Sequence, residues 1–276
     1  MGHVKMADLA YCLNSSTIRL APILDKIEVA AQAGYSAIEL WHDDIDDYLA
    51  TGGQLADIRK ALDDRGLEAP TTIMIKGWLG TTGDVHDRCM DEVKRRMNQT
   101  AELGIPYVIA GPPLGAVDMK TAAAQYGKLL ALGREFGVRP SMEYLGFAQD
   151  INSVNDALEI ISNCGEDGGT IVLDPFHCFL GGGDMEEIDQ ISAEQISISH
   201  FNDAPAHPPR RFQLDPDRVL PGDGIYDLKQ YVQLLKSTGY RRWISLEVFR
   251  RDLWGMDPLK VAITGLDKMR EVVEGS

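Results

Sequence analysis

Residues 171–177 have the sequence Ile-Val-Leu-Asp-Pro-Phe-His, in which a short apolar run ends at a carboxylate. A run of this kind is typical of a strand that is buried on both faces of a parallel sheet. Seven similar runs recur along the chain, and longer amphipathic stretches separate them. The alternation predicts an α/β fold built from successive βα units.

The apolar runs define eight predicted strands. They cover residues 8–13, 37–41, 68–74, 107–110, 139–145, 170–174, 196–200 and 243–248. The intervening stretches carry apolar residues at helical spacing, as at Leu55, Ile58 and Leu62. Eight units with right-handed crossovers and no evident edge strand favour a closed (β/α)8 TIM barrel over an open sheet. Because such barrels form one domain of about 250 residues, we expect residues 1–276 to form a single domain.

The composition restricts the possible partners. The chain has 27 basic and 42 acidic residues, a formal net charge of −15, so its field repels nucleic-acid backbones and anionic membranes. No apolar stretch approaches the ~18 residues that span a bilayer, and the N-terminus lacks the apolar region of a signal peptide. The four cysteines are widely spaced and form no Cys-x-x-Cys pair. We therefore expect a cytoplasmic protein with reduced thiols that binds neither nucleic acid nor membrane.

Each of the last four predicted strands carries an ionisable residue at or near its C-terminal end. These residues are Glu143, Asp174, His200 and Glu247. A buried charge is costly unless it is paired or binds a cation, and the ends of neighbouring barrel strands ring a common point. Three carboxylates and one imidazole suit one divalent ion; the oxygen-rich set favours Mn²⁺ and also allows Zn²⁺, Co²⁺ or Fe²⁺. Taken singly, an acidic residue at a strand end is more often a helix N-cap or a loop ion pair.

Two further residues are candidates for substrate contact. His177 follows Asp174 by three residues and could be a fifth ligand, a donor to a substrate hydroxyl or a plain loop histidine; we favour the donor. Arg218 lies in the irregular segment 204–227, which we expect to cover the site. We favour it over Arg210 and Arg211 because a stiff Pro-Gly-Asp-Gly turn follows it. On the opposite wall, Glu39 and Trp41 are further candidates, although a Trp at a barrel end is more often core.

Five blocks of the second half are distinctive together. They are Glu143-Tyr-Leu-Gly, Leu173-Asp-Pro-Phe-His177, His200-Phe-Asn-Asp203, Asp217-Arg-Val-Leu-Pro-Gly-Asp-Gly224 and Ser245-Leu-Glu-Val-Phe-Arg250. In these blocks the chain resembles the xylose isomerase-like barrel family of sugar isomerases and epimerases. Within that family it most resembles the inosose (2-keto-myo-inositol) isomerases of inositol catabolism. The similarity is densest over residues 143–250, while the first hundred residues match mainly in barrel rhythm.

The resemblance implies roles for the candidate residues. Glu143, Asp174, His200 and Glu247 would bind the metal, and Glu143 and Glu247 would also act as acid and base. His177 and Arg218 would contact a small polyhydroxy ketone. Relatives of this kind are often dimers or tetramers, so a homo-oligomer is a further expectation.

The expected reaction is the isomerisation or epimerisation of a keto-polyol or keto-sugar, with inosose as the first candidate. A divalent ion that chelates a ketone oxygen and the neighbouring hydroxyl stabilises a cis-enediolate, and a carboxylate moves the proton. The alternative is a lyase or dehydratase that expels a β-substituent from the same enolate. An endonuclease-like phosphodiesterase is disfavoured by the charge of −15, and a non-catalytic sugar-binding barrel is disfavoured by the two glutamates.

Overall fold

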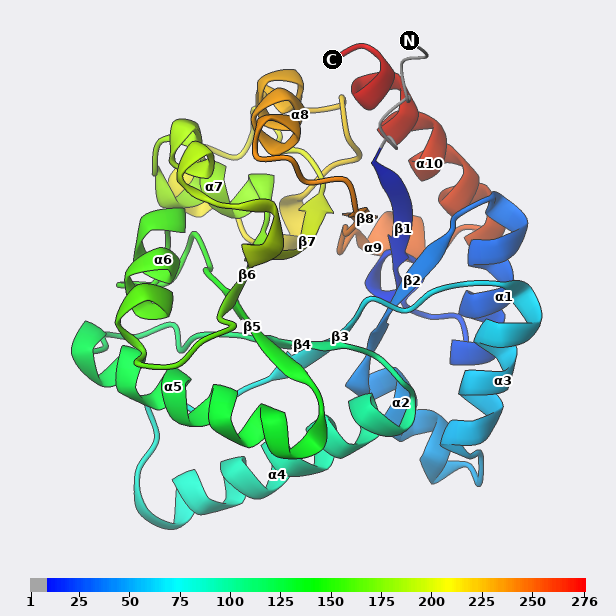
Figure 1. The fold of residues 1–276 in the computed structure, drawn as a ribbon. Coiled ribbons are helices and arrows are strands. Elements are labelled where there is room, and N and C mark those ends of the chain that lie inside the picture. The colour runs from blue at the N-terminus through cyan, green and yellow to red at the C-terminus, as the bar shows by residue number, and fades with distance from the viewer. Residues whose placement is uncertain (1–8) are drawn as a thin grey trace, which may run out of the picture.

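The computed structural model describes residues 9–276, which contain eight parallel strands closed into a barrel in the order β1 to β8 (Figure 1). The strands are β1 (Ala10–Asn14), β2 (Ala37–Trp41), β3 (Thr71–Ile75), β4 (Tyr107–Ala110), β5 (Arg139–Glu143), β6 (Thr170–Leu173), β7 (Ile196–Phe201) and β8 (Trp243–Leu246). Residue 8 of the first predicted strand lies outside the described residues, as do the N-terminal residues on which the signal-peptide prediction rests. The predicted α/β class and closed TIM barrel are confirmed.

Helices surround the barrel and connect successive strands. The α-helices are α1 (Ile23–Ala33), α2 (His42–Ala50), α3 (Leu55–Arg65), α4 (Gly83–Glu102), α5 (Met119–Phe136), α6 (Val154–Asn163), α7 (Pro175–Gly181), α8 (Leu228–Ser237), α9 (Arg251–Trp254) and α10 (Pro258–Glu274). Short 3-10 helices are η1 (Ser15–Ile18), η2 (Met185–Gln190), η3 (Ala193–Gln195), η4 (Arg210–Phe212) and η5 (Asp215–Asp217).

The predicted strands match the observed ones with shifts at their ends. The largest difference is at β3, which begins at Thr71 instead of residue 68. Glu68 makes only an isolated bridge to Ala37. Pro70, which has no backbone N–H to donate, separates this bridge from the regular pairing. The C-terminal ends, which position the site, differ from prediction by no more than two residues.

Apolar side chains fill two separate layers. Inside the barrel, a small cluster contains Cys12, Ala37, Ile73, Met74, Ile109, Val172 and Ile198. A larger cluster lies between the strands and the helices, as at Leu13, Ile38 and Leu246. This division follows from the period of two along a strand, because successive side chains point to opposite faces of the sheet.

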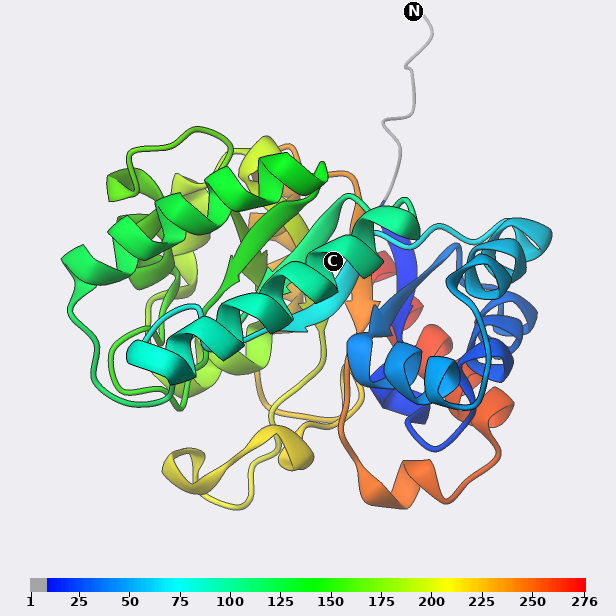
Figure 2. The same cartoon turned by 90° about the horizontal axis from the view of Figure 1, so that it is seen from below.

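The segment 204–227 and α9 project from one end of the barrel (Figure 2). This is the end where the strands finish, because 204–227 follows β7 and α9 follows β8. All four cysteines are free thiols in the structure. Among residues 9–276, no helix is long and apolar enough to cross a membrane.

Candidate metal centre

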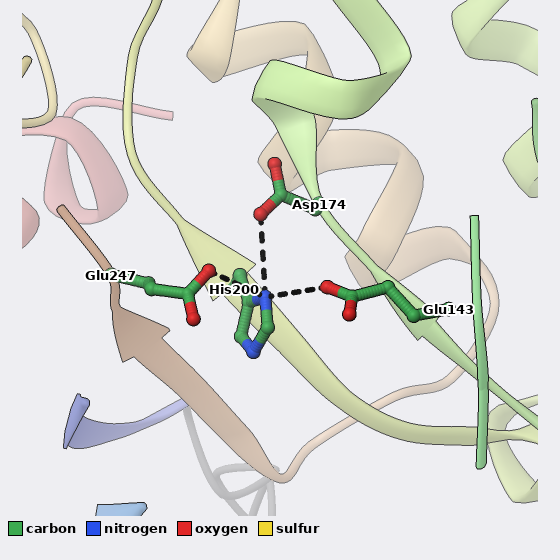
Figure 3. Close-up of side chains that lie close together, drawn as sticks. All are labelled: Glu143, Asp174, His200 and Glu247. Atoms are coloured by element: carbon green, nitrogen blue, oxygen red, sulfur yellow. Dashed lines mark hydrogen bonds and ion pairs between the residues drawn. The ribbon is translucent and has the colours of Figure 1, made fainter. Parts of the chain in front are cut away.

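Four neighbouring strands bring Glu143, Asp174, His200 and Glu247 together at the C-terminal end of the barrel (Figure 3). Glu143 is the last residue of β5, and His200 is the last but one of β7. Asp174 and Glu247 directly follow β6 and β8. All four side chains are buried, and one ligand atom from each lies within 4.8 Å of the others.

Strand alternation explains why all four point inward. Val172 and Ile198 belong to the interior cluster, and Asp174 and His200 follow them by two residues. Positions two apart along a strand share a face, so each ionisable group continues an interior row. Glu143 and Glu247 likewise follow the buried residues Ser141 and Ser245 by two positions. The ionisable layer therefore lies above a layer that is apolar on β6 and β7 and carries a serine on each of β5 and β8.

His200 lies at the centre of this layer. Its Nδ1 atom is 3.4 Å from Glu143 Oε1, 3.3 Å from Asp174 Oδ2 and 3.1 Å from Glu247 Oε2. Its Nε2 atom faces the other way and is 3.4 Å from Glu39 Oε2. One ring nitrogen and three carboxylate oxygens therefore surround a common point, which is the arrangement that a divalent cation requires of its ligands.

Asp174 has two functions, one for each carboxylate oxygen. Its Oδ1 atom accepts hydrogen bonds from the backbone N–H groups of Phe176 (2.8 Å) and His177 (3.1 Å) and so caps helix α7. Its Oδ2 atom faces His200 and accepts a hydrogen bond from Asn202 Nδ2 at 3.1 Å. The N-cap interpretation of this residue is therefore correct, and it does not exclude the ionisable cluster.

The electrostatics of the cluster show an excess of negative charge. Burial opposes the charged form of His200, but Glu247 and Glu39 outweigh it and hold the pKa of His200 well above its ordinary value. Burial also acts against the ionised form of Asp174, yet Arg218 and His177 hold its pKa well below the ordinary value. For Glu247, burial prevails and raises the pKa. Such a set of buried carboxylates fits a divalent cation, which supplies the missing positive charge.

Arg218 reaches the cluster from the segment 204–227 and is buried. Its Nη1 atom donates to Asp174 Oδ2 (2.8 Å) and Glu247 Oε2 (2.6 Å), and its Nη2 atom donates to Asp215 Oδ1 (2.7 Å). Neither Arg210 nor Arg211 lines the cavity described below. The preference for Arg218 among the three arginines of this segment is thus consistent with its position.

Asp203 anchors the segment that carries Arg218. Its carboxylate accepts hydrogen bonds from the backbone N–H groups of Ala204 (2.8 Å), Gly222 (3.1 Å), Gly224 (3.1 Å) and Tyr226 (3.1 Å). The backbone of Asp203 also pairs with Val219 in both directions at 3.0 Å. A side chain at position 224 would collide with the Asp203 carboxylate, which explains the glycine there.

His177 lies in helix α7 and is buried, so it is not a loop histidine. Its Nε2 atom is 2.9 Å from Arg218 Nη2, and its Nδ1 atom accepts a hydrogen bond from Gly146 N at 3.2 Å. A neutral imidazole has a single acceptor nitrogen, so these two donors compete for it. His177 is outside the four-residue cluster but lines the adjacent cavity.

A cavity of about 530 Å³ opens beside the cluster. Its polar wall consists of Glu143, His177, Asp215, Arg218 and Glu247. The rest of the lining is mainly apolar and includes Trp41, Ile73, Met74, Leu79, Pro112, Pro113, Phe147 and Phe249. Phe147 packs against His177, and Phe249 packs against Arg218. The volume is in the range of small-molecule sites, about 300–1,000 Å³.

Two polar residues beneath the cavity complete the site. Glu39 is buried and contacts His200, which is a different position from the predicted cavity wall. Asn14, which the sequence analysis did not single out, donates from Nδ2 to Glu39 Oε2 (3.1 Å) and to Glu247 Oε1 (3.0 Å). Asn14 is the last residue of β1, but its amide is not ionisable, so the signal that identified the other four residues does not apply to it.

Comparison with known proteins places the chain in a family. Residues 27–272 match the model of the xylose isomerase-like TIM barrel, and the chain belongs to this family. The predicted resemblance is confirmed.

The relatives that this chain matches include isomerases and dehydratases. The chain is 30% identical over 189 residues to the inosose isomerase of Halalkalibacterium halodurans, which covers 66% of this chain and 67% of the relative. It is 25% identical over 256 residues to a 3-dehydroshikimate dehydratase of Pseudomonas aeruginosa, over 91% of this chain and 40% of that protein. Among solved structures, the IolI protein with a zinc atom superposes with a TM-score of 0.90, at 24% identity over 96% of this chain and 98% of IolI.

Proposed function

We propose that this protein is a divalent-metal-dependent isomerase or epimerase of a keto-polyol or keto-sugar, with inosose as the first substrate to test. The observation that carries the proposal is the convergence of three carboxylates and one imidazole within 4.8 Å, on the wall of a small-molecule cavity. The similarity to inosose isomerases supports the isomerase class.

Glu143, Asp174, His200 and Glu247 would hold the ion. When bound, a divalent ion supplies Lewis acidity that stabilises negative charge on a ketone oxygen and its neighbouring hydroxyl. We expect Mn²⁺ from the oxygen-rich donor set, with Zn²⁺, Co²⁺ and Fe²⁺ as alternatives. The zinc atom bound by IolI, which has a similar fold, supports a metal-binding function.

Glu143 and Glu247 are the proposed acid and base because both combine cluster membership with exposure to the cavity. One of them removes the proton from the carbon next to the ketone, which gives a cis-enediolate of the substrate. Return of the proton to the former carbonyl carbon, together with transfer of the neighbouring hydroxyl proton to the former carbonyl oxygen, moves the ketone by one position. Return to the same carbon on its other face inverts that centre instead.

Arg218 and His177 are the proposed contacts for substrate oxygens. The two side chains adjoin each other at 2.9 Å on the polar wall, next to Glu247. Apolar side chains next to them suit the C–H faces of a ring: the Phe249 ring lies 5.2 Å from the Arg218 guanidinium carbon and meets Trp41 edge to face with centroids 5.8 Å apart. A polyhydroxy ketone has both kinds of surface.

The test is incubation with a panel of keto-inositols and keto-hexoses in D₂O with Mn²⁺, with products followed by NMR. An isomerase or epimerase gives a product with the same composition as the substrate, apart from deuterium at the carbon that exchanged its proton. Removal of metal by a chelator should abolish the reaction, and added Mn²⁺ should restore it. Full activity after exhaustive metal removal would refute the metal-dependent scheme.

The second candidate is a dehydratase that uses the same enolate. The similarity to 3-dehydroshikimate dehydratase over 91% of this chain favours it specifically. In the same panel a dehydratase would release water, lower the product mass accordingly and create a conjugated absorbance. Location in the cytoplasm, a single domain over residues 1–276 and a homo-oligomeric state all stay predictions.

A further inference from the structure

Glu39 is a buried carboxylate on the side of His200 that faces away from the other carboxylates. It projects from β2 and is fully buried. Its Oε2 atom is 3.4 Å from His200 Nε2, and this nitrogen has no hydrogen-bond partner among residues 9–276. Glu143, Asp174 and Glu247 all approach the opposite ring nitrogen. Glu39 is therefore placed to interact with the ring without sharing the point where the ion would lie.

The protonation of His200 decides whether it can bind a metal ion. A neutral imidazole carries one proton, and the nitrogen that binds a metal must be the one without it. The geometry makes Nδ1 the ligand, so the proton must occupy Nε2. Glu39 Oε2 lies 3.4 Å from Nε2 on this side of the ring, and a carboxylate in this position fixes the tautomer and the ring orientation.

Asn14 fixes Glu39 in turn. Its Nδ2 group donates to Glu39 Oε2 (3.1 Å) and Glu247 Oε1 (3.0 Å). Its Oδ1 atom accepts from Trp41 Nε1 (2.8 Å) and Ser16 N (3.0 Å). Both donor hydrogens and both lone pairs of the amide are used, so the side chain cannot turn without losing hydrogen bonds.

Two acidic residues are thereby oriented by one amide. Because Glu247 Oε1 is held by Asn14, Glu247 Oε2 is the oxygen that faces His200 and Arg218. The second oxygen of Glu39 is also held, since Thr71 Oγ1 donates to Glu39 Oε1. Strands β1 to β3 supply no member of the four-residue cluster, but they carry Asn14, Glu39 and Thr71, whose hydrogen bonds and contacts orient Glu247 and His200.

We propose that Glu39, oriented by Asn14, is a positioning residue that keeps His200 in the Nε2-protonated tautomer and so raises the affinity of the site for a divalent ion. This inference rests on the proposed metal centre. Glu39 acts through His200 and does not touch the ion.

The experiment compares metal binding by wild-type protein, Glu39→Gln and Ser141→Ala. Glutamine keeps the size of the side chain and an acceptor for His200 but removes the negative charge. Ser141 is a matched control, because it faces the barrel interior on β5 two residues before Glu143. Within residues 9–276 its hydroxyl forms a hydrogen bond with Ser197, at 2.6 Å, and with no member of the four-residue cluster. Each apo-protein is titrated with Co²⁺ by calorimetry, and the visible absorption of bound Co²⁺ is recorded.

We expect wild type and Ser141→Ala to bind Co²⁺ alike and Glu39→Gln to bind it roughly 10- to 100-fold more weakly, with a changed visible spectrum. Equal affinity and an unchanged spectrum for Glu39→Gln would overturn the inference. If wild type itself binds no Co²⁺, the proposed metal centre fails, which is a distinguishable result.

A second variant covers the case in which Glu39→Gln does not fold. Asn14→Ser removes the donor to both Glu39 and Glu247 but leaves the carboxylates in place. We expect about tenfold weaker Co²⁺ binding. Wild-type affinity in folded Asn14→Ser protein would overturn the role assigned to the Asn14–Glu39 pair.

Discussion

Strands β5 to β8 bring four ionisable side chains to the end of the barrel, whereas β1 to β4 and their loops line the same cavity mainly with apolar side chains. The charged half also receives Arg218, which bonds Asp174 and Glu247. The polar residues of the other half, Asn14 and Glu39, lie beneath the cavity and contact the cluster from behind. The comparison suggests that reactivity and shape are specified by different halves, so substitutions in each should have different consequences.

The largest effect should come from the charged half, at Glu247. Glu247→Gln keeps the shape of the side chain but removes a base, so we expect kcat to fall by about 100- to 10,000-fold with the fold retained. The measurement is turnover of metal-replete protein, with circular dichroism to confirm folding. Glu194→Gln is the control, since Glu194 is exposed at the far end of β7. Normal turnover by Glu247→Gln would remove Glu247 from the proposed chemistry.

An intermediate effect is expected at Arg218. Arg218→Lys keeps the charge, but a single ammonium cannot replace the guanidinium that bridges Asp174, Glu247 and Asp215. Loss of one charged hydrogen bond is worth about 1.5–3 kcal/mol, so kcat/KM should fall by about 10- to 100-fold.

Steady-state kinetics check this value, and Arg211→Lys, on the same segment but exposed, serves as the control. If both variants match wild type, the guanidinium of Arg218 has no special part in the reaction.

A smaller effect is expected in the apolar half, at Trp41. Trp41→Phe retains an aromatic ring against the cavity but loses the 2.8 Å hydrogen bond to Asn14. A neutral hydrogen bond contributes about 1 kcal/mol, which corresponds to roughly a two- to tenfold change in kcat/KM.

The ratio of kcat/KM values between two keto-polyols is the more informative measurement, because Trp41 is proposed to contact the substrate's C–H face. Trp243→Phe, at the opposite end of the barrel where β8 begins, should leave that ratio unchanged. An unchanged ratio for Trp41→Phe as well would contradict the division into a reactive and a shaping half.

The smallest effect on activity is expected at His42, which lies behind the apolar half. Burial lowers its pKa to about 4, and Nδ1 is 2.9 Å from Gln99 Oε1. Below pH 6.5 the unfolded chain takes up a proton that the folded state refuses, so stability falls as the pH drops from about 6.5 to about 4. The loss attributable to this residue is about 3 kcal/mol.

His42→Asn retains a donor for Gln99 and does not titrate. Urea unfolding across this pH range should therefore show a shallower loss of stability for His42→Asn than for wild type. Parallel curves would mean that His42 is protonated in the folded state as readily as in the unfolded one.

The sequence predicts the fold more completely than the site. Eight apolar runs suffice for the barrel because burial on both faces selects apolar strands. The boundary of β3 is missed because an apolar run that contains Pro70 does not show which of its residues pair. Strand ends locate Glu143, Asp174, His200 and Glu247, since a strand end fixes both the height and the direction of a side chain.

The residues that orient the four-residue cluster, Glu39 and Asn14, were harder to predict. The sequence places Glu39 near the site but not against His200, because that contact depends on how β2 and β7 face each other across the closed barrel. The same holds for Asn14, whose two carboxylate partners are 25 and 233 residues away. Contacts between residues so far apart in the sequence follow no local spacing rule, so the sequence alone does not predict them.

The anchoring of segment 204–227 by Asp203 has a consequence for how this enzyme class could diversify. Asp203 ties together residues 204, 222, 224 and 226, so the base of the loop is closed independently of its tip. Residues 206–212 form the tip and do not line the cavity, so insertions or deletions there would leave Arg218 in place. The tip could therefore vary in length without any alteration of the residues proposed to move protons.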